Sequence, residues 1–149
     1  IDLADARQWI DEATAARDQL PFAILETGKG KVVGSTRYLN IRSEHRSLEI
    51  GWTWLGQEWQ RTGVNTRTKL LLLTHAFERL GCQRVEFKTD ARNKRSQLAL
   101  ERIGATREGV LRKHMIVQGN HARDSVYFSV IDLEWPEVKE RLLALAERS

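Results

Sequence analysis

The stretch WQRTGVNTRTKLLLL, Trp59 to Leu73, decides how this sequence folds because it joins two segments of different character. The segment before it, SLEIGWTWL, is rich in β-branched and aromatic residues and predicts a strand from Ser47 to Leu55. The segment after it, Thr66 to Leu80, predicts a helix that Gly81 caps. The apolar side of that helix is formed by Leu70, Leu73, Ala76, Phe77 and Leu80. The stretch is therefore a short polar loop between a strand and a helix.

The remaining elements follow from periodicity and turn residues on either side of this unit. Before this unit we predict a helix over Leu3 to Gln19 and strands over Pro21 to Glu26 and Lys31 to Ile41. After it we predict a strand over Arg84 to Thr89, a helix over Asn93 to Ile103, strands over Thr106 to Val117 and Arg123 to Ile131, and a helix over Trp135 to Glu147. The apolar residues of the helix over Asn93 to Ile103 are Leu98, Ala99, Leu100 and Ile103. The first three strands of the chain are joined by short turns, so they should be antiparallel. This order predicts an α+β fold in which helices flank a mixed, mainly antiparallel sheet. With 149 residues the chain is long enough for one compact domain, residues 1–149, and too short for two.

Composition narrows the class of protein further. Hydrophobic residues make up 41% of the chain, and the chain contains only two prolines, which argues against disorder. The single cysteine, Cys82, excludes an internal disulfide framework and points to a reducing compartment. Neither an apolar run of about 20 residues nor a signal peptide is present, so we expect a cytoplasmic protein with no membrane partner. Because the chain opens on Ile1 and continues at once as a helix, we also expect that sequence precedes it.

Positive charge is concentrated in one region. The whole chain carries +4, yet Gln60 to Met115 alone holds 13 Lys and Arg against 5 Asp and Glu. Such a region attracts polyanions, either nucleic acid or a phosphorylated small molecule, although it is also compatible with an ordinary solvated surface.

The loop itself is a candidate anion site. The backbone N–H groups of six successive residues at the start of the helix could converge on a phosphate, and they belong to Arg61, Thr62, Gly63, Val64, Asn65 and Thr66. Gly63 would allow close approach. The alternative is an ordinary strand-to-helix connection.

Two other kinds of site are not supported. The Walker A pattern and Gly-x-Gly-x-x-Gly are both absent, which removes nucleotide hydrolysis and dinucleotide binding. The histidines, His45, His75, His114 and His121, are far apart and lack acidic partners at a recognised spacing, so we expect no metal.

Three motifs in order resemble those of the general N-acetyltransferase (GNAT) superfamily, in particular its RimJ/RimL-type branch of ribosomal-protein N-terminal acetyltransferases. They are the loop Gln60-x-x-Gly63-x-Asn65, the pair Asn93 and Ser96, and the helix end ALERIGA from Ala99 to Ala105. The resemblance covers nearly the whole chain. It implies the GNAT fold, with a strand and helix that would precede or overlap Ile1, and a loop that cradles the pyrophosphate of acetyl-coenzyme A.

The resemblance also implies direct transfer, in which an amine attacks the thioester while a base accepts its proton and an acid protonates the leaving thiolate. Backbone groups of Trp52, Thr53 and Trp54 would line the pantetheine arm between splayed strands and polarise the thioester carbonyl. Asn93 would hydrogen-bond the arm. As a helix cap, Asn93 also has a purely structural explanation.

Glu49 and Ser96 are the catalytic residues that the resemblance implies. Ser96 is the candidate acid, because the family's usual tyrosine position holds Leu100. Glu49 is the candidate base, acting directly or through water, and it could equally be a structural hydrogen-bond acceptor.

The sequence departs from the branch at several positions. Asn65 replaces glycine or alanine, which suggests either a left-handed backbone or a helix cap. Phe128 stands where a tyrosine is expected, so the neighbouring Tyr127 is given no role, and a carboxylate near Met115 is missing. Cys82 is interpreted as a small buried residue.

These observations favour an acetyl-coenzyme A-dependent N-acetyltransferase whose acceptor is a protein amino terminus or a small-molecule amine. The alternative is a non-catalytic coenzyme A-binding module or a basic nucleic-acid-binding domain. Specific nucleic-acid binding is not expected, because the basic region lacks exposed aromatic residues. The oligomeric state, including a homodimer, is left open.

Overall fold

The computed structural model describes residues 3–28 and 30–148, and within them six strands form one sheet in the order β1-β2-β3-β4-β6-β5. The strands are β1 (Leu20–Leu25), β2 (Val32–Arg42), β3 (Ser47–Leu55), β4 (Arg84–Asp90), β5 (Thr106–Val117) and β6 (His121–Ile131). The α-helices are α1 (Leu3–Ala15), α2 (Val64–Thr74), α3 (Lys94–Ile103) and α4 (Trp135–Glu147). Short 3₁₀ turns at Ser43–His45 and Gln57–Trp59 and a π turn at His75–Arg79 complete the described elements. The predicted α+β class and element order are confirmed.

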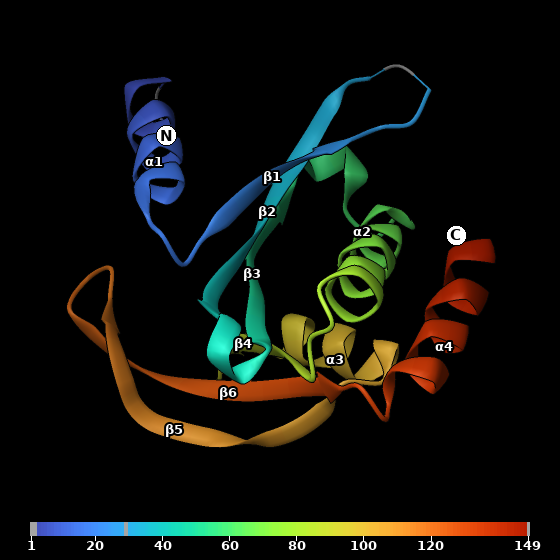
Figure 1. Ribbon diagram of the computed structural model, residues 1–149. Helices are drawn as coiled ribbons and strands as arrows, with labels where there is room; N and C mark the ends of the chain where they lie inside the picture. The colour runs from blue at the N-terminus through green and yellow to red at the C-terminus, as the bar shows by residue number, and fades with distance from the viewer. Residues whose placement is uncertain (1–2, 29, 149) are drawn as a thin grey trace.

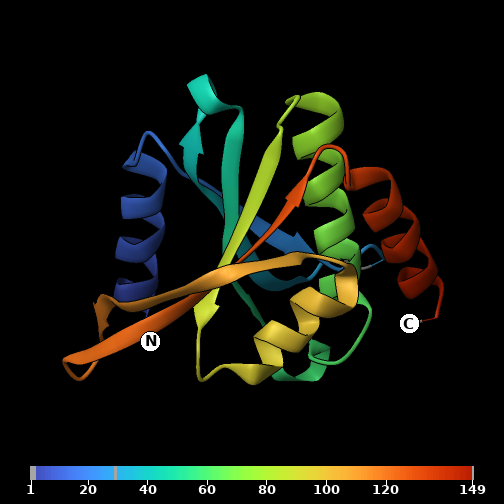
Figure 2. The ribbon, with the colours of Figure 1, turned by 90° about the horizontal axis from the view of Figure 1, so that it is seen from below.

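The helices lie on both sides of the sheet, with α1 on one side and α2, α3 and α4 on the other (Figures 1 and 2). The core fills the space between the sheet and these three helices. It includes Leu48, Ile50, Val85, Phe87, Val126, Phe128 and Val130 from the strands and Leu73, Ala76, Leu100, Ile103, Val138 and Leu142 from the helices. In the described part of the chain no helix is both long and apolar enough to cross a membrane.

The sheet divides between β3 and β4. Strands β1, β2 and β3 are antiparallel, as expected, whereas β3 and β4 are parallel and pair only from Ser47–Arg84 to Glu49–Glu86. Beyond that pair, β3 continues along β2 and β4 continues along β6. We call the two diverging segments, residues 50–55 and 87–90, the fork.

A β-bulge shapes the β3 side of the fork. Gly51 lies opposite Arg37 and Trp54 lies opposite Ser35, so β3 carries one residue more than β2 over this interval. The extra residue takes a left-handed conformation at Trp52, with φ of 50°. A bulge interrupts the regular ladder and bends the strand, which turns backbone groups away from the neighbouring strand.

Two predicted helices differ from the structure at their ends. The first ends at Ala15 instead of Gln19, because the carbonyl of Asp18 accepts a hydrogen bond from the N–H of Ile41 (3.1 Å) and ties this segment to β2. The helix predicted from Thr66 begins two residues earlier and ends in the π turn. That wider turn rotates Leu80 off the apolar side, where it is 52% exposed.

The structure confirms Gly81 at the end of its helix but places Leu98, which was predicted to be apolar core, at the surface. Gly81 has the positive φ (65°) expected of a residue that ends a helix. On α3, Leu98 is exposed instead of buried. Gln97 takes the buried place because its Nε2 donates to the carbonyls of Asp90 (3.3 Å) and Ala91 (2.9 Å).

Candidate functional site

The open end of the fork brings three elements together through Gln60. Its Nε2 donates to the carbonyl of Leu55 at the end of β3 (3.1 Å), and its Oε1 accepts from the guanidinium of Arg95 on α3 (3.1 Å). The loop before α2, the end of β3 and the first turn of α3 are therefore neighbours. These are the segments that hold most of the predicted coenzyme-binding residues.

Helix α2 presents its amino terminus at this point. Gly63 is the N-cap, and the first intrahelical bond runs from the N–H of Arg67 to the carbonyl of Gly63 (2.9 Å). The N–H groups of Val64, Asn65 and Thr66 come before this bond, and that of Val64 lies 3.4 Å from the hydroxyl of Thr62. Free N–H groups and the helix dipole together favour an anion at such a position.

The two residues before Gly63 lie in the loop and not in the helix. Arg61 is exposed and has a left-handed backbone, with φ of 64°. Thr62 donates from its hydroxyl to the carbonyl of Trp59 (2.7 Å), which holds the loop against the preceding 3₁₀ turn. Their part in a phosphate site stays a prediction.

Both explanations offered for Asn65 are wrong. The residue lies inside the first turn of α2, and it is not among the residues with positive φ. It is also not the cap, because Gly63 holds that position without a side-chain bond. The left-handed residue of this loop is Arg61. The Oδ1 atom of Asn65 is buried and has no hydrogen-bond partner within the described residues, so it is an unsatisfied acceptor.

Helix α3 begins with the cap that the sequence predicts. The Oδ1 of Asn93 accepts from the backbone N–H of Ser96 (3.0 Å), which establishes a structural role for Asn93. Ser96 is half-buried one turn into the helix. A shallow hollow of about 500 Å³ lies beside this cap, lined by Asp90, Arg92 and Asn93. The guanidinium of Arg92 lowers the pKa of the Asp90 carboxyl well below its usual range.

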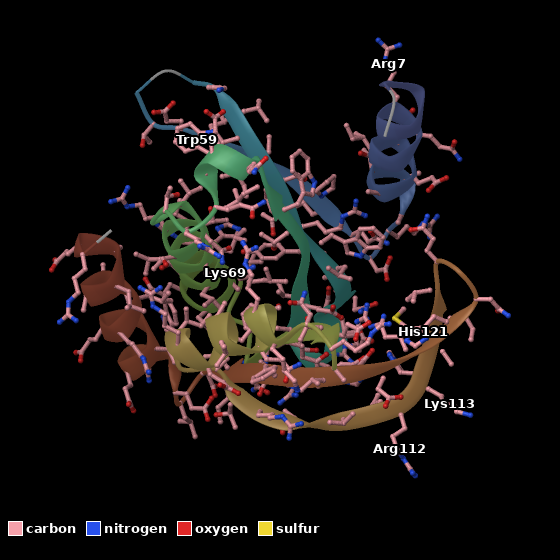
Figure 3. The ribbon with its side chains drawn as sticks, turned by 180° about the vertical axis from the view of Figure 1, so that it is seen from behind. Arg7, Trp59, Lys69, Arg112, Lys113 and His121 are labelled. Atoms are coloured by element: carbon pink, nitrogen blue, oxygen red, sulfur yellow. The ribbon has the colours of Figure 1, made fainter. Side chains whose placement is uncertain are left out.

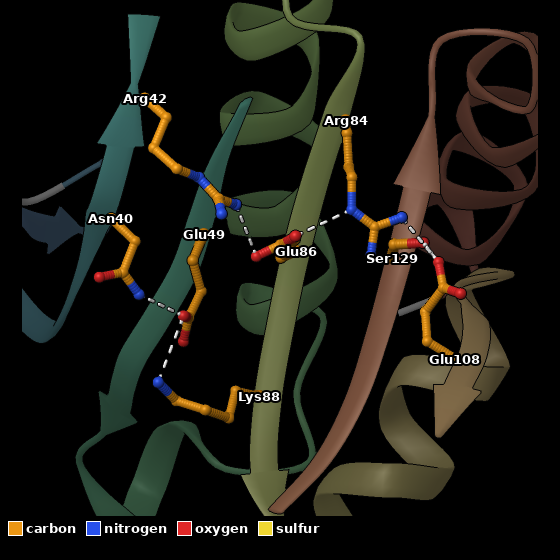
Figure 4. A network of polar contacts seen from close by, with 8 residues as sticks. All are labelled: Asn40, Arg42, Glu49, Arg84, Glu86, Lys88, Glu108 and Ser129. Carbon is orange, nitrogen blue, oxygen red and sulfur yellow. Dashed lines mark hydrogen bonds and ion pairs between the residues drawn. The ribbon is translucent and has the colours of Figure 1, made fainter. Parts of the chain in front are cut away.

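Glu49 lies where the pairing of β3 and β4 ends. Leu48 and Ile50, on either side of it, belong to the core, so its carboxylate points to the opposite face of the sheet, away from α2 (Figure 4). It is 2% exposed. Its Oε2 accepts from the Nδ2 of Asn40 (2.7 Å) and lies 3.4 Å from the Nζ of Lys88. The amide and the ammonium therefore fix the position of this carboxylate.

Ion pairs continue along the same face. Glu86 lies opposite Glu49 and pairs with Arg42 (2.9 Å) and Arg84 (2.9 Å). Arg84 also reaches Glu108 on β5 (2.7 Å), which accepts from the hydroxyl of Ser129 (2.6 Å), as Figure 4 shows. Four ionic side chains are thus linked on this half of the face, next to Glu49.

Tyr127 lies on the Glu49 side of the sheet, whereas Phe128 is completely buried in the core. The Nζ of Lys88 is 5.9 Å from the centre of the Tyr127 ring, and His114 meets that ring edge-on at 5.7 Å. Burial, with smaller contributions from Glu49 and Glu86, raises the pKa of Tyr127. Asn40, Lys88 and His114 carry no sequence signal for a site, because they come from three separate strands and share no motif.

Lys69 is the second residue that sequence reasoning missed. It projects from α2 into the interior and is 6% exposed (Figure 3). Its Nζ donates to the hydroxyl of Thr53 (3.0 Å), which lies 2.8 Å from the hydroxyl of Thr36. Burial lowers the pKa of Lys69 to about 7. A signal was present, because Lys69 stands four residues before Leu73 and therefore on the apolar side of the helix.

The flanking tryptophans of β3 face solvent. Trp52 is 61% exposed and Trp54 is 54% exposed, and the guanidinium of Arg37 lies 5.1 Å from the centre of the Trp52 ring. Thr53, between them, turns its hydroxyl toward Lys69. The three residues predicted to line the pantetheine arm thus form one side of the fork.

Comparison with known proteins identifies the family. Residues 1–106 match the model of the acetyltransferase (GNAT) domain. The chain is 35% identical over 106 residues to the Bacillus subtilis (strain 168) protein named "Putative ribosomal N-acetyltransferase YdaF", an alignment that covers 71% of this chain and 57% of that protein. The chain thus spans little more than half the length of this curated relative.

Solved acetyltransferase structures support the same family. A GCN5-related N-acetyltransferase from Brucella melitensis superposes with a TM-score of 0.87 and 35% identity, covering 95% of this chain and 63% of that one. A "putative acetyltransferase" from T. thermophilus gives a TM-score of 0.85 and 43% identity, covering 93% and 72%. The resemblance inferred from the three motifs is confirmed: the chain belongs to the GNAT acetyltransferase family, in its RimJ/RimL-like branch.

Proposed function

We propose that this chain catalyses transfer of an acetyl group from acetyl-coenzyme A to an amine by direct attack. The observation that carries the proposal is the fork, because its open end adjoins the amino termini of both α2 and α3 while its inner end adjoins Glu49. One end therefore suits a phosphorylated coenzyme, and the other offers a carboxylate for proton transfer.

The coenzyme fits the residues at the open end. The N–H groups of Val64, Asn65 and Thr66 in the first turn of α2, with those of Arg61, Thr62 and Gly63 before them, would hold the pyrophosphate. The exposed side chain of Arg61 adds positive charge there. The orphaned Oδ1 of Asn65 would repel a phosphate oxygen but would accept from an amide N–H, which the pantetheine arm supplies.

The arm would run along the fork. The backbone of Trp52, Thr53 and Trp54 would line the arm at the bulge, where the register between β2 and β3 shifts. Asn93 uses its Oδ1 as a cap, so only its Nδ2 would contact the arm. Ser96, on the next turn, would hydrogen-bond the sulfur.

Glu49 would act on the acceptor from the opposite face of the sheet. The acceptor reacts as a neutral amine, and its nitrogen must lose one proton as it bonds to the thioester carbon. Oε2 of Glu49 is engaged by Asn40 and Lys88, and Oε1 lies beside Gly51, where a Cβ would be 3.4 Å from this oxygen. We infer that Oε1 takes the proton, directly or through one water. The tetrahedral carbon then collapses, the C–S bond breaks and the amide is formed.

A thiol-release assay with acetyl-coenzyme A tests this function. The amine panel should contain free amino acids, polyamines and peptides with free amino termini, the last because YdaF is named for ribosomal substrates. Release of coenzyme A that depends on both an amine and enzyme, with the acetyl group recovered on the amine nitrogen, is the expected result. Tight coenzyme binding with no transfer to any amine would favour a non-catalytic coenzyme A-binding module instead.

A further inference from the structure

Lys69 reaches both sides of the fork from α2. Its Nζ bonds to Thr53 on β3 (3.0 Å) and lies 5.6 Å from the centre of the Phe87 ring on β4. Phe87 is the first residue of β4 after the last β3–β4 pair. The ammonium group is therefore at the inner end of the fork, on the helix-covered side, whereas Glu49 faces the other side of the sheet.

The transfer reaction needs an acid at this end. When the C–S bond breaks, the electron pair stays on sulfur, and a thiolate in a buried site is costly without a proton or a cation. Ser96 is the acid that the family resemblance implies, but an alcohol is a weaker acid than a thiol, so transfer of its proton to the thiolate is unfavourable. Leu100 offers no proton either and is buried in the core.

We propose that Lys69 is the general acid of the reaction, and that its ammonium protonates the leaving thiolate from the helix side of the fork. This inference rests on the proposed acetyltransferase function. It assigns the two proton transfers to opposite faces of the sheet, with Glu49 on the acceptor side and Lys69 on the coenzyme side.

The acidity of Lys69 suits this task. Its pKa of about 7 is below the roughly 8.5 of an ordinary thiol, so proton transfer to the thiolate is favourable. An ordinary lysine, with a pKa of about 10.4, would hold its proton instead. Burial is the one cause that lowers the value. Nζ contacts the hydroxyl of Thr53 and the ring of Phe87, and the neighbouring Thr36 adds another neutral hydroxyl.

Atoms and charges balance in the proposed step. The acceptor nitrogen bonds to the acetyl carbon and gives its proton to Glu49, the C–S bond breaks, and the Lys69 ammonium gives one proton to sulfur. The products are the amide, the thiol of coenzyme A, a protonated Glu49 and a neutral Lys69. Return of one proton from Glu49 to solvent and of one from solvent to Lys69 restores the enzyme. The hydroxyl of Thr53, which is half-buried and bonded to Nζ, would carry the second proton into the site.

The first experiment tests proximity and needs no acceptor. Lys69→Cys is incubated with coenzyme A disulfide, and mixed-disulfide formation is followed by mass spectrometry. The expected result is attachment of one coenzyme A at position 69, prevented by excess acetyl-coenzyme A. The matched control is Lys88→Cys, because Lys88 lies on the other face of the sheet beside Glu49. The unmodified chain reports on its buried Cys82.

The second experiment tests the proton with the best amine from the assay panel. In the unmodified chain, kcat should fall as the pH rises through the pKa of Lys69 in the complex. In Lys69→Met this fall of kcat at high pH should disappear. At pH values below the pKa of Lys69, the variant's kcat should be about 100-fold lower than that of the unmodified chain, with little change in acetyl-coenzyme A affinity. Lys69→Arg keeps the charge but holds its proton, so it should not restore activity.

The outcomes separate the two proposals. If calorimetry shows no acetyl-coenzyme A binding to the unmodified chain, the proposed function fails and this inference fails with it. If the coenzyme binds but position 69 is not trapped, or Lys69→Met keeps the alkaline limb, only the role of Lys69 is overturned. Full activity of Lys69→Arg would show that charge, and not a proton, is what position 69 supplies.

Discussion

A single carboxylate, Glu49, is the residue on which the acceptor side depends. We predict that Glu49→Gln lowers kcat by about 100-fold and flattens the rise of kcat with pH, because an amide accepts no proton. The measurement is the pH dependence of steady-state turnover, with thermal melting of both proteins to confirm folding. Glu86→Gln is the matched control, since Glu86 is the residue paired with Glu49 across the strands and is occupied by two arginines. Equal losses in the two variants would mean that Glu49 is only structural.

Lys69 should lower the free energy of unfolding of the protein, in addition to its proposed role in the reaction. A lysine whose native pKa is about 7 binds fewer protons in the folded than in the unfolded chain between roughly pH 7 and 10. Stability therefore falls as the pH drops through this window, and the loss is complete below about pH 7. We predict that Lys69→Met raises the free energy of unfolding at pH 7 by about 1 kcal/mol or more, and less at pH 10. Urea unfolding at both pH values measures this, and a destabilised Lys69→Met would contradict it.

At the scale of elements, the start of α3 combines a cap with a predicted ligand. We predict that Asn93→Ala lowers the free energy of unfolding by about 1 kcal/mol, because the bond from the N–H of Ser96 is lost. Asn93→Asp should keep the cap and remove the Nδ2 donor, so it should unfold like the parent but bind acetyl-coenzyme A more weakly. Urea unfolding and binding calorimetry check the two effects. Unchanged coenzyme binding by Asn93→Asp would leave Asn93 a cap alone.

The start of α2 offers a different test, because its asparagine makes no cap. We predict that Asn65→Ala leaves the free energy of unfolding unchanged or raises it, since the variant removes a buried acceptor without a partner. Coenzyme affinity should fall if that acceptor meets the pantetheine arm. Thermal melting measures the stability of Asn65→Ala, and calorimetry measures its coenzyme affinity. If the role of Asn65 is structural, the variant would instead be less stable than the parent.

The sequence predicts these elements well where local rules decide them. Ser47–Leu55 was predicted to the residue, and the Asn93 cap and the Gly81 helix end follow from side-chain and backbone preferences that act over a few residues. The π turn that exposes Leu80 was missed, since apolar spacing does not distinguish it from a regular helix.

The contents of the site depend on tertiary structure and were only partly predictable. Glu49 and Ser96 came from a family resemblance, whereas Asn40 and Lys88 reach Glu49 only through strand register. The depressed pKa of Lys69 requires knowing that α2 covers the fork, although its place on an apolar helix side was visible.

At the scale of the whole molecule, the distribution of positive charge and the position of the fork both fit acetyl-coenzyme A as the ligand. The basic region from Gln60 to Met115 includes the exposed Arg61, Arg92, Lys94 and Arg95, which lie at the starts of α2 and α3. We predict that acetyl-coenzyme A binding weakens about tenfold between roughly 0.1 M and 1 M salt, because these exposed charges are screened. Calorimetry at several salt concentrations measures it. Tight, sequence-selective binding of duplex DNA would instead assign the basic surface to nucleic acid.

The central claim is that the fork and the amino terminus of α2 form an acetyl-coenzyme A site, and binding calorimetry with Gly63→Val tests it most directly. Gly63 is the buried N-cap of α2, where a branched side chain would stand between the free N–H groups and a phosphate. The unmodified chain should bind acetyl-coenzyme A and fail to bind acetylated pantetheine without phosphates, and Gly63→Val should lose coenzyme binding while remaining folded by circular dichroism. A folded Gly63→Val that binds acetyl-coenzyme A as tightly as the unmodified chain would show that this loop is only a connection between a strand and a helix.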